Sequence, residues 1–186
     1  MTTAKRMDVT DTRERRDPLS LSAKLAALLR LNRDQDGFIP SAREVAEATA
    51  SPGRRKLSHG QVNGLMNGTS SNPTMSTVAA LSGALDAPAA FLLPGPEWDD
   101  LTALTVYQER PEAREVLRLM QDLPEPDILD TITQLRELRR RAGLPQDVPA
   151  IPPPPPGVDQ PRDGRPRRHL SLDEAAERAA DDLEGR

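Results

Sequence analysis

Two short helical patterns, separated by an Asn67-Gly68 pair, lie within residues 58–93 and restrict the chain to packed helices. Apolar residues recur at helical spacing on one face of each pattern. They are Val62, Leu65 and Met66 in the first pattern and Val78, Leu81 and Leu85 in the second. Asparagine and glycine adopt the left-handed conformation that ends a helix at little cost. The pair therefore predicts where the first helix ends and the turn begins.

Polar residues and a proline predict where the helices begin. Ser58 precedes the first pattern, where its side chain can accept a hydrogen bond from an unpaired N–H group of the helix. Ser41 and Glu44 have the spacing of a capping box, in which each side chain bonds the backbone N–H of the other. Pro73 precedes the second pattern, and a proline at the first helical position loses no hydrogen bond. We therefore expect helices to start close to Ser41, Ser58 and Pro73.

The composition agrees with an all-α fold. Of the 186 residues, 36% are apolar and only 2% aromatic, which favours leucine and alanine packing between helices over a β-sandwich. Leu25, Leu28 and Leu29 form a stripe that predicts the first helix within residues 19–32. The sequence contains no cysteine, so we expect no disulfide and no thiolate metal site, and no other metal or cofactor is expected. No apolar run approaches the ~20 residues of a membrane span, and a cytoplasmic protein is expected.

Residues 58–93 resemble the second half of a helix-turn-helix domain of the lambda-repressor-like (XRE) superfamily. The matching features are the short helix ending in Asn67-Gly68, the polar connector to Pro73, the helix with Thr77, Val78, Leu81 and Leu85, and a last short helix with Phe91 and Leu92. Within that superfamily the chain is most similar to the EspR-type regulators of actinobacteria, and the resemblance covers residues 19–142. The resemblance implies a five-helix DNA-binding domain over residues 19–93, a helical extension over residues 94–144, and association with the nucleoid.

Base reading is expected on the exposed face of the helix within residues 58–67. Side chains on the first turns of such a helix reach base edges in the major groove, where glutamine and asparagine can pair with adenine for ~1–3 kcal/mol. The best candidates are Gln61 and Asn63, followed by Ser58, His59 and Asn67. No arginine lies on this face, so a bidentate contact to guanine is not expected there.

Phosphate contacts are expected from side chains beside this helix. The connection over residues 49–57 is longer than the roughly three or four residues of a standard helix-turn-helix, and it contains three adjacent cations. The candidates are Arg43, Arg54, Arg55, Lys56, Thr69 and Ser70. Residues 19–93 contain seven Lys/Arg against five Asp/Glu, whereas residues 94–145 contain seven against eleven. We therefore expect an affinity for duplex DNA that falls steeply with salt. The alternative for the three cations is an exposed loop without a DNA contact.

The last helix of the extension carries an apolar stripe over four turns, with arginines beside it. The residues expected to form the dimer contact are Ile128, Leu129, Ile132, Leu135 and Leu138. Packing on the chain's own domain is the alternative, and the family resemblance favours a homodimer. Two copies would double the phosphate contacts.

Three segments are expected to lie outside the folded part. Residues 1–18 lack apolar periodicity and are predicted to be a disordered N-terminal arm. Residues 145–170 are predicted to be a proline-rich linker, in which residues 152–156 are all proline and favour an extended spacer. Residues 171–186 form an acidic tail with the pattern of a short helix, and a protein partner for this tail is left open.

Function is expected to be binding rather than catalysis. His59 and His169 lie in unrelated segments, and no phosphate loop, metal-ligand cluster or nucleophile motif is present in the sequence. One hypothesis is a DNA-binding transcriptional regulator or nucleoid-type protein that dimerises through its C-terminal helices. The other is a protein-interaction adaptor on a repressor-like domain that has lost DNA binding. The net charge of -4 and the missing arginine keep the adaptor open as an alternative. The 22 arginines against three lysines are typical of a GC-rich bacterial genome, in agreement with the actinobacterial resemblance.

Overall fold

The computed structural model describes residues 17–50 and 55–161, and this part of the chain is mostly helical. Its α-helices are α1 (Leu21–Leu31), α2 (Ala42–Ala48), α3 (His59–Met66), α4 (Met75–Ala84), α5 (Leu101–Glu109), α6 (Pro111–Leu119) and α7 (Glu125–Arg141). Two 3-10 helices, η1 (Ala89–Leu92) and η2 (Pro96–Trp98), and two short strands, β1 (Phe38–Ile39) and β2 (Gln160–Pro161), complete the described elements. None of the described helices is long and apolar enough to cross a membrane. Most of the predicted N-terminal arm, Arg54, residues 162–170 of the predicted linker and the acidic tail lie outside the described residues.

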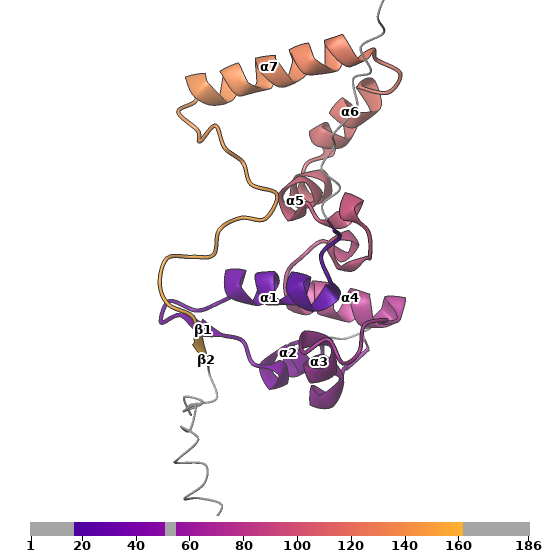
Figure 1. Ribbon diagram of the computed structural model, residues 1–186, viewed down its shortest axis with the longest axis vertical. Helices are drawn as coiled ribbons and strands as arrows, with labels where there is room; N and C mark the ends of the chain where they lie inside the picture. The colour runs from indigo at the N-terminus through magenta and orange to yellow at the C-terminus, as the bar shows by residue number, and fades with distance from the viewer. Residues whose placement is uncertain (1–16, 51–54, 162–186) are drawn as a thin grey trace, which may run out of the picture.

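Most of the hydrophobic core lies in α1 to α4 and η1, which we call the helical domain (Figure 1). The predicted stripes are confirmed as its core residues, namely Leu25, Leu28, Leu29, Val62, Leu65, Val78, Leu81 and Leu85, while Met66 is partly buried against them. Phe91 lies at the centre with 0% exposure. The prediction of an all-α fold is therefore confirmed at the level of secondary structure. The last short helix of the domain is a 3-10 helix, η1, rather than an α-helix.

The helix starts follow the capping signals of the sequence. Ser41 and Glu44 form the predicted capping box at the start of α2. Ser58 caps α3, where it forms a second capping box with Gln61. The next helix, α4, begins after Thr74, whose side chain accepts a hydrogen bond from the backbone N–H of Thr77. Each start is thus fixed by hydrogen bonds among neighbouring residues.

A buried lysine joins α1 to the segment that follows η1. The Lys24 side chain is 1% exposed, and its Nζ lies 2.6 Å from Asp99 Oδ1. The same Nζ donates to the Leu93 carbonyl at 2.8 Å. Asp99 also accepts from the Leu19 N–H at 2.8 Å. Burial alone would raise the pKa of Asp99, but the hydrogen bonds from Lys24 and Leu19 hold it below its usual value.

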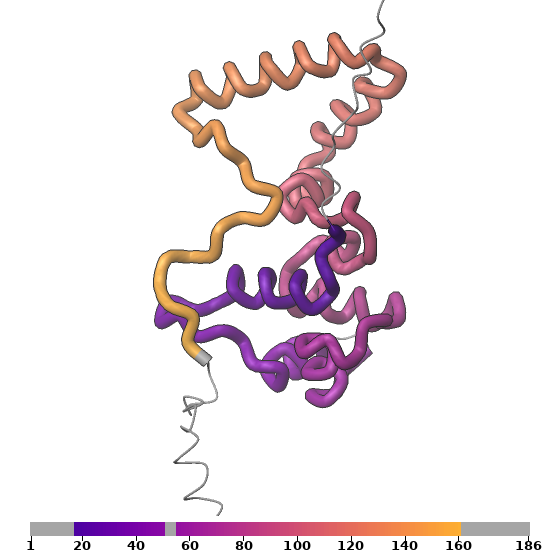
Figure 2. Tube along the Cα trace, in the orientation of Figure 1, coloured from indigo at the N-terminus to yellow at the C-terminus, as the bar shows by residue number. Residues whose placement is uncertain are grey.

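Beyond α5, the chain leaves the helical domain. We call residues 111–141, which comprise α6, α7 and the turn between them, the arm. Figures 1 and 2 show that α7 stands apart from the helical domain. No residue of α6 or α7 is buried. Leu101 in α5, in contrast, is 5% exposed and belongs to the core.

The chain then returns to the helical domain along residues 149–161, which we call the strap (Figure 2). The Thr102 N–H donates to Ala150 O at 2.9 Å, and Ile151 packs against the core. The Thr102 hydroxyl donates to Pro149 O at 2.7 Å. The sequence predicts a proline-rich linker over residues 145–170, and within it the structure places contacts with the folded part at residues 149–151. The prolines keep the segment extended, but the residues on either side of them are anchored to the folded part.

Candidate nucleic-acid interface

Helix α3 separates an apolar face from a polar face. Val62 and Leu65 are 0% and 3% exposed, and the helix packs against α1 and α2. The polar face bears the residues expected to read bases, all of them exposed, namely Ser58, His59, Gln61, Asn63 and Asn67. None of these five side chains is buried against the chain's own helices.

Two of these side chains are occupied at the start of α3. The Ser58 hydroxyl accepts the Gln61 N–H at 3.2 Å, and Gln61 Oε1 accepts the Ser58 N–H at 3.0 Å. This capping box uses the oxygen of the Gln61 amide and not its nitrogen. A carbonyl oxygen has two lone pairs, so Gln61 can still accept from an adenine amino group and donate to its ring nitrogen.

Asn63 and Asn67 form a pair one helical turn apart. The Asn67 Nδ2 donates to Asn63 Oδ1 at 3.1 Å, and both side chains are exposed. Gly60 lies on the same helix, and a Cβ added there would meet no atom within 4 Å. The backbone of α3 is therefore uncovered at Gly60, which lets another molecule approach it closely.

Three of the predicted residues line one shallow cavity between α3 and the start of α4. The cavity has a volume of about 370 Å³, and Arg55, Gln61 and Ser70 contribute to its wall. Asn72, Thr74 and Thr77 also line it, although they are not among the predicted site residues. The sequence does contain a signal for this part of the wall, namely the capping position of α4. A capping threonine places hydroxyl and N–H groups at the start of a helix.

The connection between α2 and α3 is anchored at both ends by a buried threonine. The Thr49 hydroxyl donates to Ala46 O at 2.7 Å and accepts the Leu57 N–H at 3.0 Å. Thr49 and Leu57 are each 1% exposed. Arg55 and Lys56 are exposed and come directly before this anchor, so both cations lie close to the start of α3.

The remaining phosphate candidates are distributed around α3. Arg43 is on α2, where its Nε lies 3.1 Å from Glu47 Oε1 and its side chain is 80% exposed. Thr69 and Ser70 follow α3, and each donates to the Gly64 carbonyl, from the Thr69 hydroxyl at 3.1 Å and the Ser70 N–H at 3.0 Å. Arg43 is therefore already paired within α2, whereas Ser70 lines the cavity between α3 and α4.

The predicted dimer residues lie on α7 in the arm. Leu129, Leu135 and Leu138 are 55%, 50% and 53% exposed, and Ile132 is 36% exposed. Ile128 is half-buried. The five side chains belong to one helix and are far from α3 in the fold (Figure 1).

Within the described residues, no group of three or more histidine and carboxylate side chains has the geometry to hold a metal ion. The polar groups around α3 are amides, hydroxyls and cations, which bind by hydrogen bonding and charge. No family model matches the chain, and no curated protein matches it.

Proposed function

We propose that the chain binds duplex DNA through the exposed face of α3, as a homodimeric transcriptional regulator or nucleoid-type protein. The observation that carries this proposal is the division of α3 into two faces. Val62 and Leu65 face the core, while Gln61 and Asn63 present their amides to solvent. Exposed glutamine and asparagine on the first turns of a helix carry the groups that pair with adenine in the major groove.

The groups around α3 suit the DNA backbone. Arg55 and Lys56 supply positive charge next to the helix start, and Ser70 lines the same cavity as Arg55 and Gln61. Cations that neutralise phosphates release condensed counterions, and this release provides most of the sequence-independent affinity. The cavity between α3 and α4 is therefore the expected place for the phosphates that flank the base-reading face.

The decisive experiment measures binding of a labelled DNA duplex over a series of salt concentrations. Charge reversal of Arg54, Arg55 and Lys56 to glutamate should abolish the mobility shift at moderate salt, and the salt slope is compared at low salt, where residual binding can be measured. Loss of three phosphate contacts lowers the slope of log K against log salt by about 2–3. A control variant, Arg110→Glu, reverses one exposed charge between α5 and α6, outside α3 and outside the apolar surface of the arm. This variant should keep the salt slope of the wild type.

Base reading is tested separately with single substitutions on α3. Duplexes enriched from a random pool by wild-type protein serve as the specific probe. Gln61→Ala or Asn63→Ala should each weaken that probe by roughly 5- to 150-fold, which corresponds to ~1–3 kcal/mol, and should leave non-specific binding unchanged. Equal loss on both kinds of DNA would assign the residues to stability rather than to base reading.

Dimerisation through the arm belongs to the same proposal. The exposed stripe of α7 includes Leu129, Leu135 and Leu138, and α6 adds Leu117 at 54% exposure. A second copy is the partner that would cover this surface and bring two α3 helices to one duplex. Two linked sites compensate for a weak single site.

A protein-interaction adaptor is the second candidate, and one observation favours it. The oxygens of Gln61 and Asn63 already accept hydrogen bonds within the chain. If these bonds persist in solution, less of each amide is available to a base. The adaptor predicts no DNA shift at any salt concentration.

A further inference from the structure

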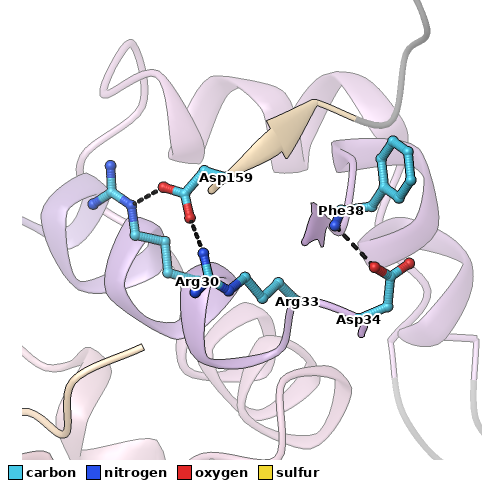
Figure 3. Close-up of polar contacts among 5 residues, drawn as sticks. All are labelled: Arg30, Arg33, Asp34, Phe38 and Asp159. Carbon is cyan, nitrogen blue, oxygen red and sulfur yellow. Dashed lines mark hydrogen bonds and ion pairs between the residues drawn. The ribbon is translucent and has the colours of Figure 1, made fainter. Parts of the chain in front are cut away.

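The carboxylate of Asp159, near the end of the strap, lies between two arginines (Figure 3). Arg30 belongs to α1, and Arg33 follows this helix. Asp159 Oδ2 accepts from Arg30 Nε at 2.8 Å, and Asp159 Oδ1 accepts from Arg33 Nη1 at 2.7 Å. The hydrogen bond from Arg30 and the charges of both arginines hold the pKa of Asp159 below its usual value. The carboxylate is therefore ionised at neutral pH.

Arg33 differs from Arg30 in its burial. The side chain of Arg33 is 3% exposed, whereas that of Arg30 is 53% exposed. A buried guanidinium without an anion is costly, because it has lost its water. Among the described residues, Asp159 is the carboxylate that forms an ion pair with Arg33. With the strap in place, this position therefore favours a carboxylate next to Arg33.

The strand β1 provides a main-chain contact next to these arginines. Phe38 and Ile39 pair in parallel with Gln160 and Pro161, and the Gln160 N–H donates to Gly37 O at 2.7 Å. Gly37 has a φ of +83°, and a Cβ there would lie only 2.4 Å from Val158 O. A glycine is therefore required where the strap crosses.

The edge of β1 is formed without help from the strap. Asp34 Oδ1 accepts the Phe38 N–H at 2.8 Å, and the Asp34 N–H donates to Phe38 O at 3.1 Å (Figure 3). Both bonds lie within a turn of five residues. The turn thus holds β1 in position for an incoming strand.

We propose that Arg30, Arg33 and the edge of β1 form a binding site for an extended peptide that carries a carboxylate, and that residues 158–161 occupy this site as an intramolecular ligand. Recognition combines a carboxylate on the two arginines with strand addition to β1. Main-chain hydrogen bonds contribute affinity in this mode, and the side-chain contacts contribute specificity. The carboxylate of Asp159 sets the register of the peptide on β1, because Asp159 directly precedes Gln160, whose N–H donates to Gly37 O.

The intramolecular ligand is held weakly enough to be exchanged. Its pairing with β1 involves two residues, and the Asp159 side chain is 34% exposed. The prolines at 152–156 have no N–H group, so none of them can donate a main-chain hydrogen bond to the helical domain. Occupation of the site therefore depends strongly on the tether, which gives the strap a high effective concentration. A peptide of the same pattern should bind once the strap is weakened.

The test adds a fluorescein-labelled peptide of sequence PPGVDQP to the full-length chain and measures fluorescence anisotropy. Asp159→Asn should release the strap from Arg30 and Arg33, so the peptide should bind this variant at least tenfold more tightly than the wild type. Asp147→Asn removes the same charge at an exposed position outside the site and should behave as the wild type. The peptide PPGVNQP should bind the Asp159→Asn variant at least tenfold more weakly than PPGVDQP.

Two further variants protect the experiment against a folding defect. Gln160→Pro removes the N–H that bonds Gly37 and leaves the helical domain unchanged, so it should also admit the peptide. Arg30→Gln in the Asp159→Asn background should weaken peptide binding, because Arg30 is exposed enough to be replaced without loss of the fold. Equal binding to the wild type and both strap variants, or no discrimination between the two peptides, overturns the proposal.

Discussion

The helical domain and the arm differ in where their apolar side chains lie. In the helical domain, Leu81 and Phe91 are both 0% exposed. In α7, no residue is buried, although its stripe is as regular as any in the sequence. Isolated helices of this length are marginal in water, and most helical stability comes from packing. Amphipathic periodicity therefore identifies a helix, but it does not determine which surface covers the apolar face of that helix.

The largest effect is expected from the centre of the helical domain. Phe91→Ala should lower the free energy of unfolding by about 3–5 kcal/mol, because the side chain is fully buried and leaves a cavity. Urea unfolding followed by circular dichroism measures this loss. Leu135→Ala on the arm, at a dilution that prevents self-association, should change the value by less than about 0.5 kcal/mol. Similar losses of unfolding free energy for the two variants would contradict the distinction between a buried core in the helical domain and an exposed arm.

The buried ion pair next to η1 should have the second largest effect. Asp99→Ala leaves the Lys24 ammonium buried without its carboxylate, and we expect a loss of about 2–3 kcal/mol, reduced because Asp99 is partly exposed. Lys24→Met combined with Asp99→Ala should lose less than Asp99→Ala alone, since no charge is then buried. Exposed Glu97→Ala is the matched control. An additive loss in the double variant would show that the pair is not coupled.

The same pair has a defined pH dependence. The pKa of Asp99 is lower in the folded chain than the ordinary value of an aspartate, so folding favours the ionised form. The contribution of this carboxylate is therefore fully present above the ordinary aspartate pKa of about 3.9 and is lost as the pH falls through the lower folded pKa. Unfolding of the wild type and of Asp99→Ala, measured between pH 7 and pH 3, should converge only at the acid end.

A smaller effect is expected in the connection between α2 and α3. Thr49→Val removes the hydroxyl that bonds Ala46 O and the Leu57 N–H, and it leaves a buried N–H without a partner. The expected loss is about 1–2 kcal/mol. Thr69→Val removes a hydroxyl that is exposed, and it should cost less than about 0.5 kcal/mol. Equal losses of unfolding free energy for the two substitutions would show that the buried hydrogen bonds of Thr49 do not anchor the connection between α2 and α3.

The sequence predicts the local features of this fold well. The capping box at Ser41, the cap at Ser58 and the helix end at Gly68 all depend on neighbouring residues, and the structure confirms them. The exposed face of α3 was predicted for the same reason, since periodicity alone separates its two faces. Whether that face binds DNA stays a prediction.

Contacts between distant segments were not predicted. The pair of Arg33 and Asp159 joins residues 126 positions apart, and the proline run between the arm and Asp159 indicates an extended chain but not its direction. Lys24 and Asp99 have no local pattern that marks them as partners. In each case the pairing depends on how helices pack in three dimensions, which periodicity along the chain does not encode.

The smallest effect on stability is expected from the arm, and the same variant should have a large effect on association. Leu135→Glu with Leu138→Glu changes two half-exposed side chains, so the free energy of unfolding should shift by less than about 0.5 kcal/mol. Analytical ultracentrifugation should show self-association weakened at least tenfold, because two copies would bring these charges together in an apolar contact. Val106→Glu places a charge at a similarly exposed position on α5 and should leave association unchanged. A stability loss above about 2 kcal/mol in the double variant would mean that α7 packs on its own chain, since burial of an unpaired charge produces losses of that size.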